Sequence, residues 1–452
     1  MTLTKEELHQ WNSIEEILLH QFPQKLALPI RLQSLTLAEY FNGSLVKQAF
    51  PSQLRSLTCG AWFNQSIEGV DLPDGLQILT FGDHFDQSLE KVVLPSSLQS
   101  LSFGQNFNQN MDRVIFPSGL SKLAFGQMFN QSLVRVTLPS ELQNLTFGKD
   151  FNNGNTSMEN VVLPSGLQNL VFGEHFNHIM VNVTLPTYLR ALTFGDRYNQ
   201  SMNGTMPRVV VVGVIFLLTL SAVLFSLGMT GHKFLFWVVV GLLVLVFLLV
   251  TCLGTANKMV FPDSLQSLSF GHDFDQTLRG VALPGNLQSL TFGHNFSQSL
   301  DKVILPSSLQ NLAFGFRFNH SLKKVALPKD LQSLTFGSDF NQSLENVALP
   351  IGLKCLTFGD RFNQSMENVA LPNCLQSLVF GHDFNQDMDN VSLPSELEIL
   401  TFGHNFNQSI KKMVLPIGLR DLVFGQDFDQ NMDAVALPNG LQNLIFGEGF
   451  PV

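Results

Sequence analysis

The sequence has few charged residues, and fewer positive than negative ones. Charged residues make up 14% of the 452 residues, well below the roughly 25% of an average soluble protein. Asp and Glu (36) outnumber Lys and Arg (26), and the net charge is −10. Proteins that bind nucleic acids rely on Lys and Arg against phosphate. We therefore predict no nucleic-acid partner.

Cysteines and catalytic motifs are also scarce. The four cysteines (Cys59, Cys252, Cys355 and Cys374) include no Cys-x-x-Cys pair and no pattern typical of a disulfide framework. Cys59 stands where other repeats carry Phe, which indicates a small core residue. No Walker loop, Gly-x-Gly-x-x-Gly, His-Glu-x-x-His, nucleophile elbow or catalytic Cys/His arrangement occurs. We predict a non-enzymatic protein without catalytic, cofactor-binding or metal sites.

A 22-residue repeat dominates the chain. Prolines recur every 22 residues from Pro29 to Pro139 and again from Pro262 to Pro438, and Pro164 follows a single spacing of 25. So strict a period is typical of a solenoid, in which stacked repeats share one continuous core. Seventeen units can be aligned, and the sequence therefore predicts seventeen rungs.

One unit, Leu98 to Gly119, shows the pattern LQSLSFGQNFNQNMDRVIFPSG. With Leu98 as position 1, apolar residues fall at positions 1, 4, 6, 10, 14, 17 and 19. The opening Leu-x-x-Leu-x-Phe alternates about its second Leu, which predicts a short strand with one buried face. Position 7 is Gly in sixteen of the seventeen units, which indicates either a positive φ or a close backbone approach to the next rung.

Position 11 carries a second regular feature, being Asn in twelve units and Asp in three. Buried backbone groups in a turn need hydrogen-bonding partners, and an Asn side chain both donates and accepts. Stacked rung on rung, these side chains are expected to form a ladder along the loops. Members of this set include Asn64, Asn108, Asn130, Asn341 and Asn407.

These residues carry a family resemblance. The recurring Leu-Pro-x-x-Leu-x-x-Leu-x-Phe-Gly-x-x-Phe-Asn-Gln-Ser-Leu resembles the FNIP repeat, a variant of the leucine-rich repeat found in protist proteins. The resemblance runs from about Leu28 to the C-terminus, apart from one insert, and Leu-Pro stands where the family usually has Ile-Pro. It implies a right-handed, leucine-rich-repeat-like parallel β-stack and a role in protein interaction. It implies no activity, and neither an F-box nor a kinase domain accompanies the repeats.

The two ends of the repeat array are expected to differ. Residues 1–27 are expected to form an N-terminal amphipathic helical cap, because Leu8, Trp11, Ile14, Leu18 and Phe22 recur at helical spacing. No apolar signal-peptide core precedes them. At the other end the chain stops within a unit, and an uncapped rung exposes strand edge and apolar core. Self-association there, or a truncated sequence, is expected.

A hydrophobic segment, residues 203–256, interrupts the array between solenoid arms 28–202 (eight rungs) and 257–452 (nine rungs). Two uncharged runs, 209–228 and 234–253, are about 20 residues each, enough to cross the ~30 Å core of a bilayer. We predict a transmembrane hairpin contacting lipid through 209–253. Buried core helices are less favoured, because no surrounding globular sequence could cover them. Removing 203–256 restores a normal repeat, so a retained intron is the competing origin.

The charges that flank the hairpin predict its orientation. Arg208 and Lys258 lie at its ends, whereas the short linker holds Lys233 and His232. Because positive charge favours the cytosolic side, both arms are expected there, giving a multi-pass membrane protein. If the segment is an artefact, the protein is expected to be cytoplasmic.

Two further features of the sequence are candidate sites. His272 and His294, and likewise His382 and His404, occupy position 8 of consecutive rungs, each followed by Asp or Asn (Asp273, Asn295, Asp383 and Asn405). Such pairs could form a weak metal site, but position 8 varies widely and a solvated turn is favoured. Strand positions 2, 3 and 5 repeat as Gln, Ser and Thr, a uniform face that lacks the aromatic and Arg anchors of a specialised interface. Its protein partner is therefore not identifiable.

Overall fold

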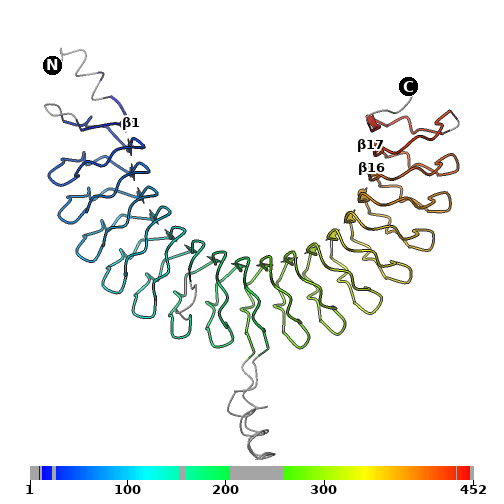
Figure 1. The fold of residues 1–452 in the computed structure, drawn as a ribbon, viewed down its shortest axis with the longest axis horizontal. Coiled ribbons are helices and arrows are strands. Elements are labelled where there is room, and N and C mark those ends of the chain that lie inside the picture. The colour runs from blue at the N-terminus through cyan, green and yellow to red at the C-terminus, as the bar shows by residue number, and fades with distance from the viewer. Residues whose placement is uncertain are drawn as a thin grey trace, which may run out of the picture.

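The protein forms one curved stack of rungs, with the strands along the concave side and the loops on the convex side (Figure 1). This computed structural model describes residues 10, 13–22, 27–151, 158–203, 258–433 and 435–447. The predicted spans 209–228 and 234–253 lie outside these residues. Within the described ranges, no helix has the length and apolar character needed to span a membrane.

Eighteen strands form a single parallel sheet in which each strand pairs with the next one along the chain. The prediction of a leucine-rich-repeat-like parallel stack of 22-residue rungs is confirmed. Eight of the strands follow β1 before residue 203, and nine follow residue 258. The strands are β1 Glu16–Leu19, β2 Ser34–Leu37, β3 Ser56–Thr58, β4 Ile78–Thr80, β5 Ser100–Ser102, β6 Lys122–Ala124, β7 Asn144–Thr146, β8 Asn169–Val171, β9 Ala191–Thr193, β10 Ser267–Ser269, β11 Ser289–Thr291, β12 Asn311–Ala313, β13 Ser333–Thr335, β14 Cys355–Thr357, β15 Ser377–Val379, β16 Ile399–Thr401, β17 Asp421–Val423 and β18 Asn443–Ile445.

In the three-residue strands, only the central residue faces the core. In β13 the central Leu334 is fully buried, while Ser333 and Thr335 are partly exposed on the concave face. The same register holds from rung to rung, so that Leu334 lies beside Leu356 of β14. Strand residues of one face therefore stack in columns, as a period of two requires.

Phenylalanine fills the core behind the strands. Within one rung, the rings of Phe336 (position 6) and Phe340 (position 10) lie 3.8 Å apart between centroids. Between rungs, Phe340 lies 6.0 Å from Phe362, and the two rings are within 8° of parallel. Both side chains are almost wholly buried. Rings at the same position stack along most of the array and contribute to its continuous apolar core.

The glycine at position 7 is required by close approach and not by a positive φ. A methyl group at Gly337 would overlap the carbonyl oxygen of Gly315, one rung earlier. Positive φ occurs instead at position 16, in the turn farthest from the strand. Residues with positive φ at this position are Lys47, Gly69, Asn160, Gly280, Lys302 and Asn346.

The stack continues without a break across the hydrophobic segment. Strand β9 pairs directly with β10, and Leu192 lies beside Leu268. The backbone N–H of Met259 donates to the carbonyl of Met202 over 2.9 Å. An uninterrupted rung closes the same turn in the same way, with Val303 N–H donating to Leu300 over 2.9 Å. The two chain ends that flank the segment therefore leave from one closed turn.

The prediction of a helical cap over residues 1–27 is wrong at residues 16–19, which the structure describes as a strand. Residues 16–19 form strand β1, which pairs in parallel with β2. The remaining described part is mostly irregular, and residues 1–9, 11–12 and 23–26 lie outside the described set. These residues form a strand in spite of their helical spacing, because strand pairing gives hydrogen-bond partners to the backbone groups at the open edge of β2. For example, the Ala38 N–H donates to the Leu19 carbonyl over 2.7 Å.

Candidate interaction surfaces

The concave sheet face is polar and nearly uniform. In β11, Gln288 lies just before the strand, and Ser289 and Thr291 are partly exposed on it. Large apolar side chains are few on this face, with Ile78 43% exposed and Ile399 37% exposed. Such a surface offers hydrogen-bond donors and acceptors over a long, curved strip.

The asparagine ladder at position 11 is present as predicted. The Asn341 Oδ1 accepts hydrogen bonds from the Asn363 backbone N–H (3.0 Å) and from Gln364 Nε2 (2.9 Å), both in the next rung. Across the hydrophobic segment, Asp275 N–H donates to Asn199 Oδ1 over 3.0 Å. Each side chain thus satisfies a loop N–H one rung away, and its role is structural.

The histidines at position 8 stack face to face. The ring centroids of His272 and His294 are 4.4 Å apart, and those of His382 and His404 are 4.7 Å apart. The ring nitrogens lie in the ring planes, so two parallel rings direct them side by side and not toward one shared ion.

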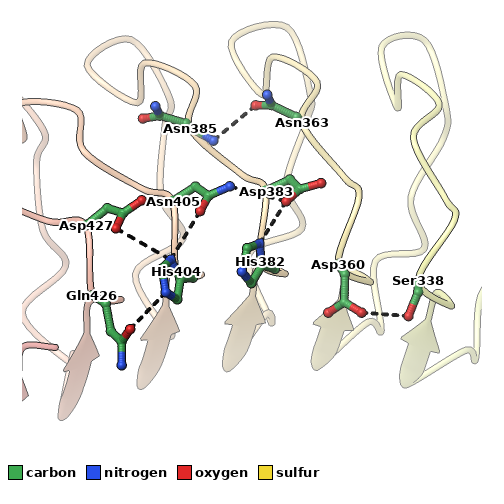
Figure 2. A network of polar contacts seen from close by, with 10 residues as sticks. All are labelled: Ser338, Asp360, Asn363, His382, Asp383, Asn385, His404, Asn405, Gln426 and Asp427. Carbon is green, nitrogen blue, oxygen red and sulfur yellow. Dashed lines mark hydrogen bonds and ion pairs between the residues drawn. The ribbon is translucent and has the colours of Figure 1, made fainter. Parts of the chain in front are cut away.

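Neighbouring side chains already bind these nitrogens (Figure 2). The His382 Nδ1 lies 2.8 Å from Asp383 Oδ1, and His404 Nε2 lies 2.9 Å from Gln426 Oε1. Among the residues that the structure describes, no group of three or more His, Cys, Asp or Glu side chains could hold a metal ion. The arrangement supports the interpretation of position 8 as a polar turn.

An aromatic row at position 9 was missed by the sequence reasoning, which examined only strand positions for anchors. Tyr40 and Trp62 lie 6.3 Å apart, and Trp62 stacks on His84 at 4.1 Å between centroids. Tyr40 is 74% exposed and Trp62 is 48% exposed. The detectable signal was three aromatic residues in a row at one repeat position. Exposed Tyr and Trp are typical of binding surfaces.

Charged residues concentrate at positions 15 and 16, which we call the outer turn. Several of them pair between rungs, as Arg113 does with Glu90 (2.7 Å) and Lys412 with Asp389 (3.5 Å). The Glu90 carboxylate raises the pKa of the Arg113 guanidinium through a hydrogen bond and through its charge. Exposed pairs of this kind contribute little stability. By contrast, burial raises the pKa of the Cys59 thiol, in line with its predicted place in the core.

The fold and its repeat define a leucine-rich-repeat-like solenoid. The FNIP Repeat family matches residues 63–106, 107–150, 274–317, 318–361, 362–405 and 406–449. These matches cover more than half of the chain, each spanning two rungs. The chain belongs to the FNIP repeat family.

Two solved structures are similar to this chain. The crystal structure of CroV588, described as a novel circular leucine-rich-repeat protein, shares 34% identity with a TM-score of 0.62, covering 97% of this chain and 67% of that one. An internalin from Listeria monocytogenes shares 12% identity with a TM-score of 0.40, covering 81% of this chain and 84% of that one. The comparison with curated proteins gave no match.

Proposed function

We propose that this protein is a non-enzymatic scaffold for protein interaction, held in a membrane by a hairpin formed by residues 209–228 and 234–253. The family and the long polar sheet face support the scaffold role. The two uncharged runs of about 20 residues support the anchor.

One observation carries the proposal: the rung that contains the hydrophobic segment is closed like any other. Met202 and Met259 are joined by a backbone hydrogen bond of 2.9 Å, so both ends of the segment leave from the same turn. Two antiparallel helices pack with axes about 8–10 Å apart, which suits two ends that start close together. The concave face is then free for a partner on the opposite side of the arc (Figure 1).

Extraction tests the anchor. Membranes from cells that make the full chain are washed at alkaline pH, which strips peripheral proteins. We expect the full chain to stay with the lipid and a variant lacking residues 203–256 to be released, because the spans are gone. Release of the full chain would overturn the anchor.

The seamless closure also supports a second candidate, a soluble solenoid whose segment is a retained intron. A segment that the fold does not need can be absent from the mature protein. Sequencing the transcript across codons 203–256 separates the two candidates. A transcript population that lacks these codons throughout would favour the soluble protein.

The orientation of the arms follows from the same hairpin. Because two spans return the chain to its starting side, both arms face one compartment, and Arg208 and Lys258 favour the cytosol. Protease added to sealed microsomes should digest both arms. Protection of both arms would show that they face the lumen.

A further inference from the structure

Five basic side chains gather beside the point where the hydrophobic segment leaves the solenoid. They occupy the outer turns of four consecutive rungs, from the interrupted rung onward, and all five are exposed. Their turns contain one acidic residue, Asp301. We call this set the basic ridge, and it consists of Lys258, Arg279, Lys302, Lys323 and Lys324.

The ridge is positively charged, whereas the protein as a whole has a net charge of −10. In other rungs three of the outer-turn cations have carboxylate partners: Lys91 with Glu68 (3.4 Å), Arg113 with Glu90 (2.7 Å) and Lys412 with Asp389 (3.5 Å). Within the described part of the chain, no ridge side chain lies within ion-pair distance of a carboxylate. Its positive charge is therefore not neutralised by the protein itself.

Position 18 carries an exposed aliphatic side chain in two of the ridge rungs, as it does in other rungs at Val93, Ile115, Val162 and Val414. Val260 is 76% exposed and Ile304 is 84% exposed, although both follow a buried residue of the core. Basic residues beside exposed aliphatic ones are typical of surfaces that meet the headgroup region of a bilayer.

The ridge is physically continuous with the exit point of the segment. Asn203, the last described residue before it, donates from Nδ2 to the carbonyl of Arg279 over 3.1 Å. Lys258, the first described residue after it, donates from Nζ to the carbonyl of Gly280 over 3.0 Å. If the segment enters a bilayer, these turns lie at the level of the headgroups.

We propose that the basic ridge docks on the anionic headgroups of the membrane that the hairpin enters, which rests on the proposed function. Neighbouring strands are about 5 Å apart, and the rungs fan outward toward the convex side, so the four outer turns lie in succession over more than about 15 Å (Figure 1). The cytosolic leaflet carries the negative surface potential that attracts such clusters. Because the outer turns lie on the convex side of the stack (Figure 1), docking through them would direct the concave face away from the bilayer.

Amine labelling of the full chain in vesicles tests the ridge. The chain contains a control in Lys411 and Lys412, two exposed lysines at the same repeat positions of a distant rung. Because Lys412 pairs with Asp389, each lysine is compared with itself in vesicles with and without phosphatidylserine. The protein is reconstituted in phosphatidylcholine vesicles with or without phosphatidylserine, and labelling rates are read by peptide mass spectrometry. With phosphatidylserine, we expect Lys302, Lys323 and Lys324 to react roughly threefold more slowly, or slower still, relative to the control pair. Without phosphatidylserine the difference in labelling rate should disappear, because the anionic headgroups are gone. At high salt it should also disappear, because the electrostatic attraction is screened.

A charge-reversed variant checks that the ridge itself causes the protection. Arg279→Glu combined with Lys302→Glu should restore the labelling of Lys323 and Lys324 in phosphatidylserine vesicles, whereas Lys411→Glu should not. Suppose the protein floats with the vesicles but ridge and control lysines are labelled at equal rates. That result would overturn the docking of the ridge without contradicting the transmembrane anchor. Protein that fails to float with any vesicle would overturn both.

Discussion

The strand-end turn at positions 7–9 and the outer turn at positions 15–16 belong to the same rung but tolerate very different changes. At Gly337 the backbone lies so close to the preceding rung that one methyl group would overlap the Gly315 carbonyl. In the rung between β9 and β10, the outer turn accommodates 54 additional residues and still forms its closing hydrogen bond.

The difference follows from what each turn contacts. The strand-end turn stacks directly on its neighbours, because the rings at positions 6 and 10 pack on either side of it. The outer turn faces solvent, and an added segment there can leave without separating the rungs. The entropic cost of closing the longer loop is limited, since each doubling of loop length costs only about 0.6 kcal/mol and the 54 added residues amount to about five doublings, or about 3 kcal/mol.

The largest expected effect lies in the core behind the strand-end turn. Phe336→Ala removes a ring that is 3% exposed and stacked at 3.8 Å on Phe340. We expect the free energy of unfolding to fall by about 3–5 kcal/mol in a denaturant titration. The exposed neighbour Gln332 is the control, and Gln332→Ala should cost less than about 0.5 kcal/mol. Equal losses would show that the rung register is wrong.

A smaller loss is expected from one methyl group in the strand-end turn itself. Gly337→Ala should lower the free energy of unfolding by about 1–3 kcal/mol, because the rungs must separate to relieve the overlap. Gly285 has open space around its α-carbon and no positive φ. Gly285→Ala should therefore be neutral or slightly stabilising. A neutral Gly337→Ala would refute the close-approach explanation of position 7.

The next largest loss in the free energy of unfolding is expected from the asparagine ladder. Asn341→Ala leaves the Asn363 N–H and the Gln364 amide without their shared acceptor, at a cost of about 1–2 kcal/mol. Asn341→Asp should recover most of this loss, because Asp86 and Asp275 accept the same bonds in other rungs. Asn390→Ala, in an exposed outer turn, should cost under about 0.5 kcal/mol. Chemical denaturation of the three variants measures the ranking.

The smallest loss of stability is expected from the largest deletion. A variant lacking residues 203–256 should stay in solution without detergent and unfold in one transition, since the junction restores a complete repeat. Circular dichroism during thermal unfolding measures this. Aggregation of the variant, while the full chain behaves well in detergent, would mean that the segment supports the fold.

Much of the solenoid could be predicted because each repeat faces the same neighbours. The 22-residue period, the buried central Leu of each strand and the Asn ladder recur at fixed positions, and contacts between rungs are contacts between equal positions. The restored repeat across the insert predicted the closed turn at Met202 and Met259 for the same reason.

Features that break the repeat could not be predicted in this way. Residues 16–19 have helical spacing, but the open edge of β2 makes a strand of them. The aromatic residues from Tyr40 to His84 share one repeat position in the sequence, but only the structure shows that position 9 is accessible and that the rings stack. The histidine pairs looked capable of sharing a metal until their rings proved parallel.

The sequence by itself determined the period, the core positions and the place where a long insert is accepted, because these depend on which residues repeat. The tertiary structure alone decided why position 7 must be glycine, where positive φ falls and which charges gather beside the insert. Those outcomes depend on the distance between rungs and on the curve of the stack, which bring residues 22 or 76 positions apart into contact.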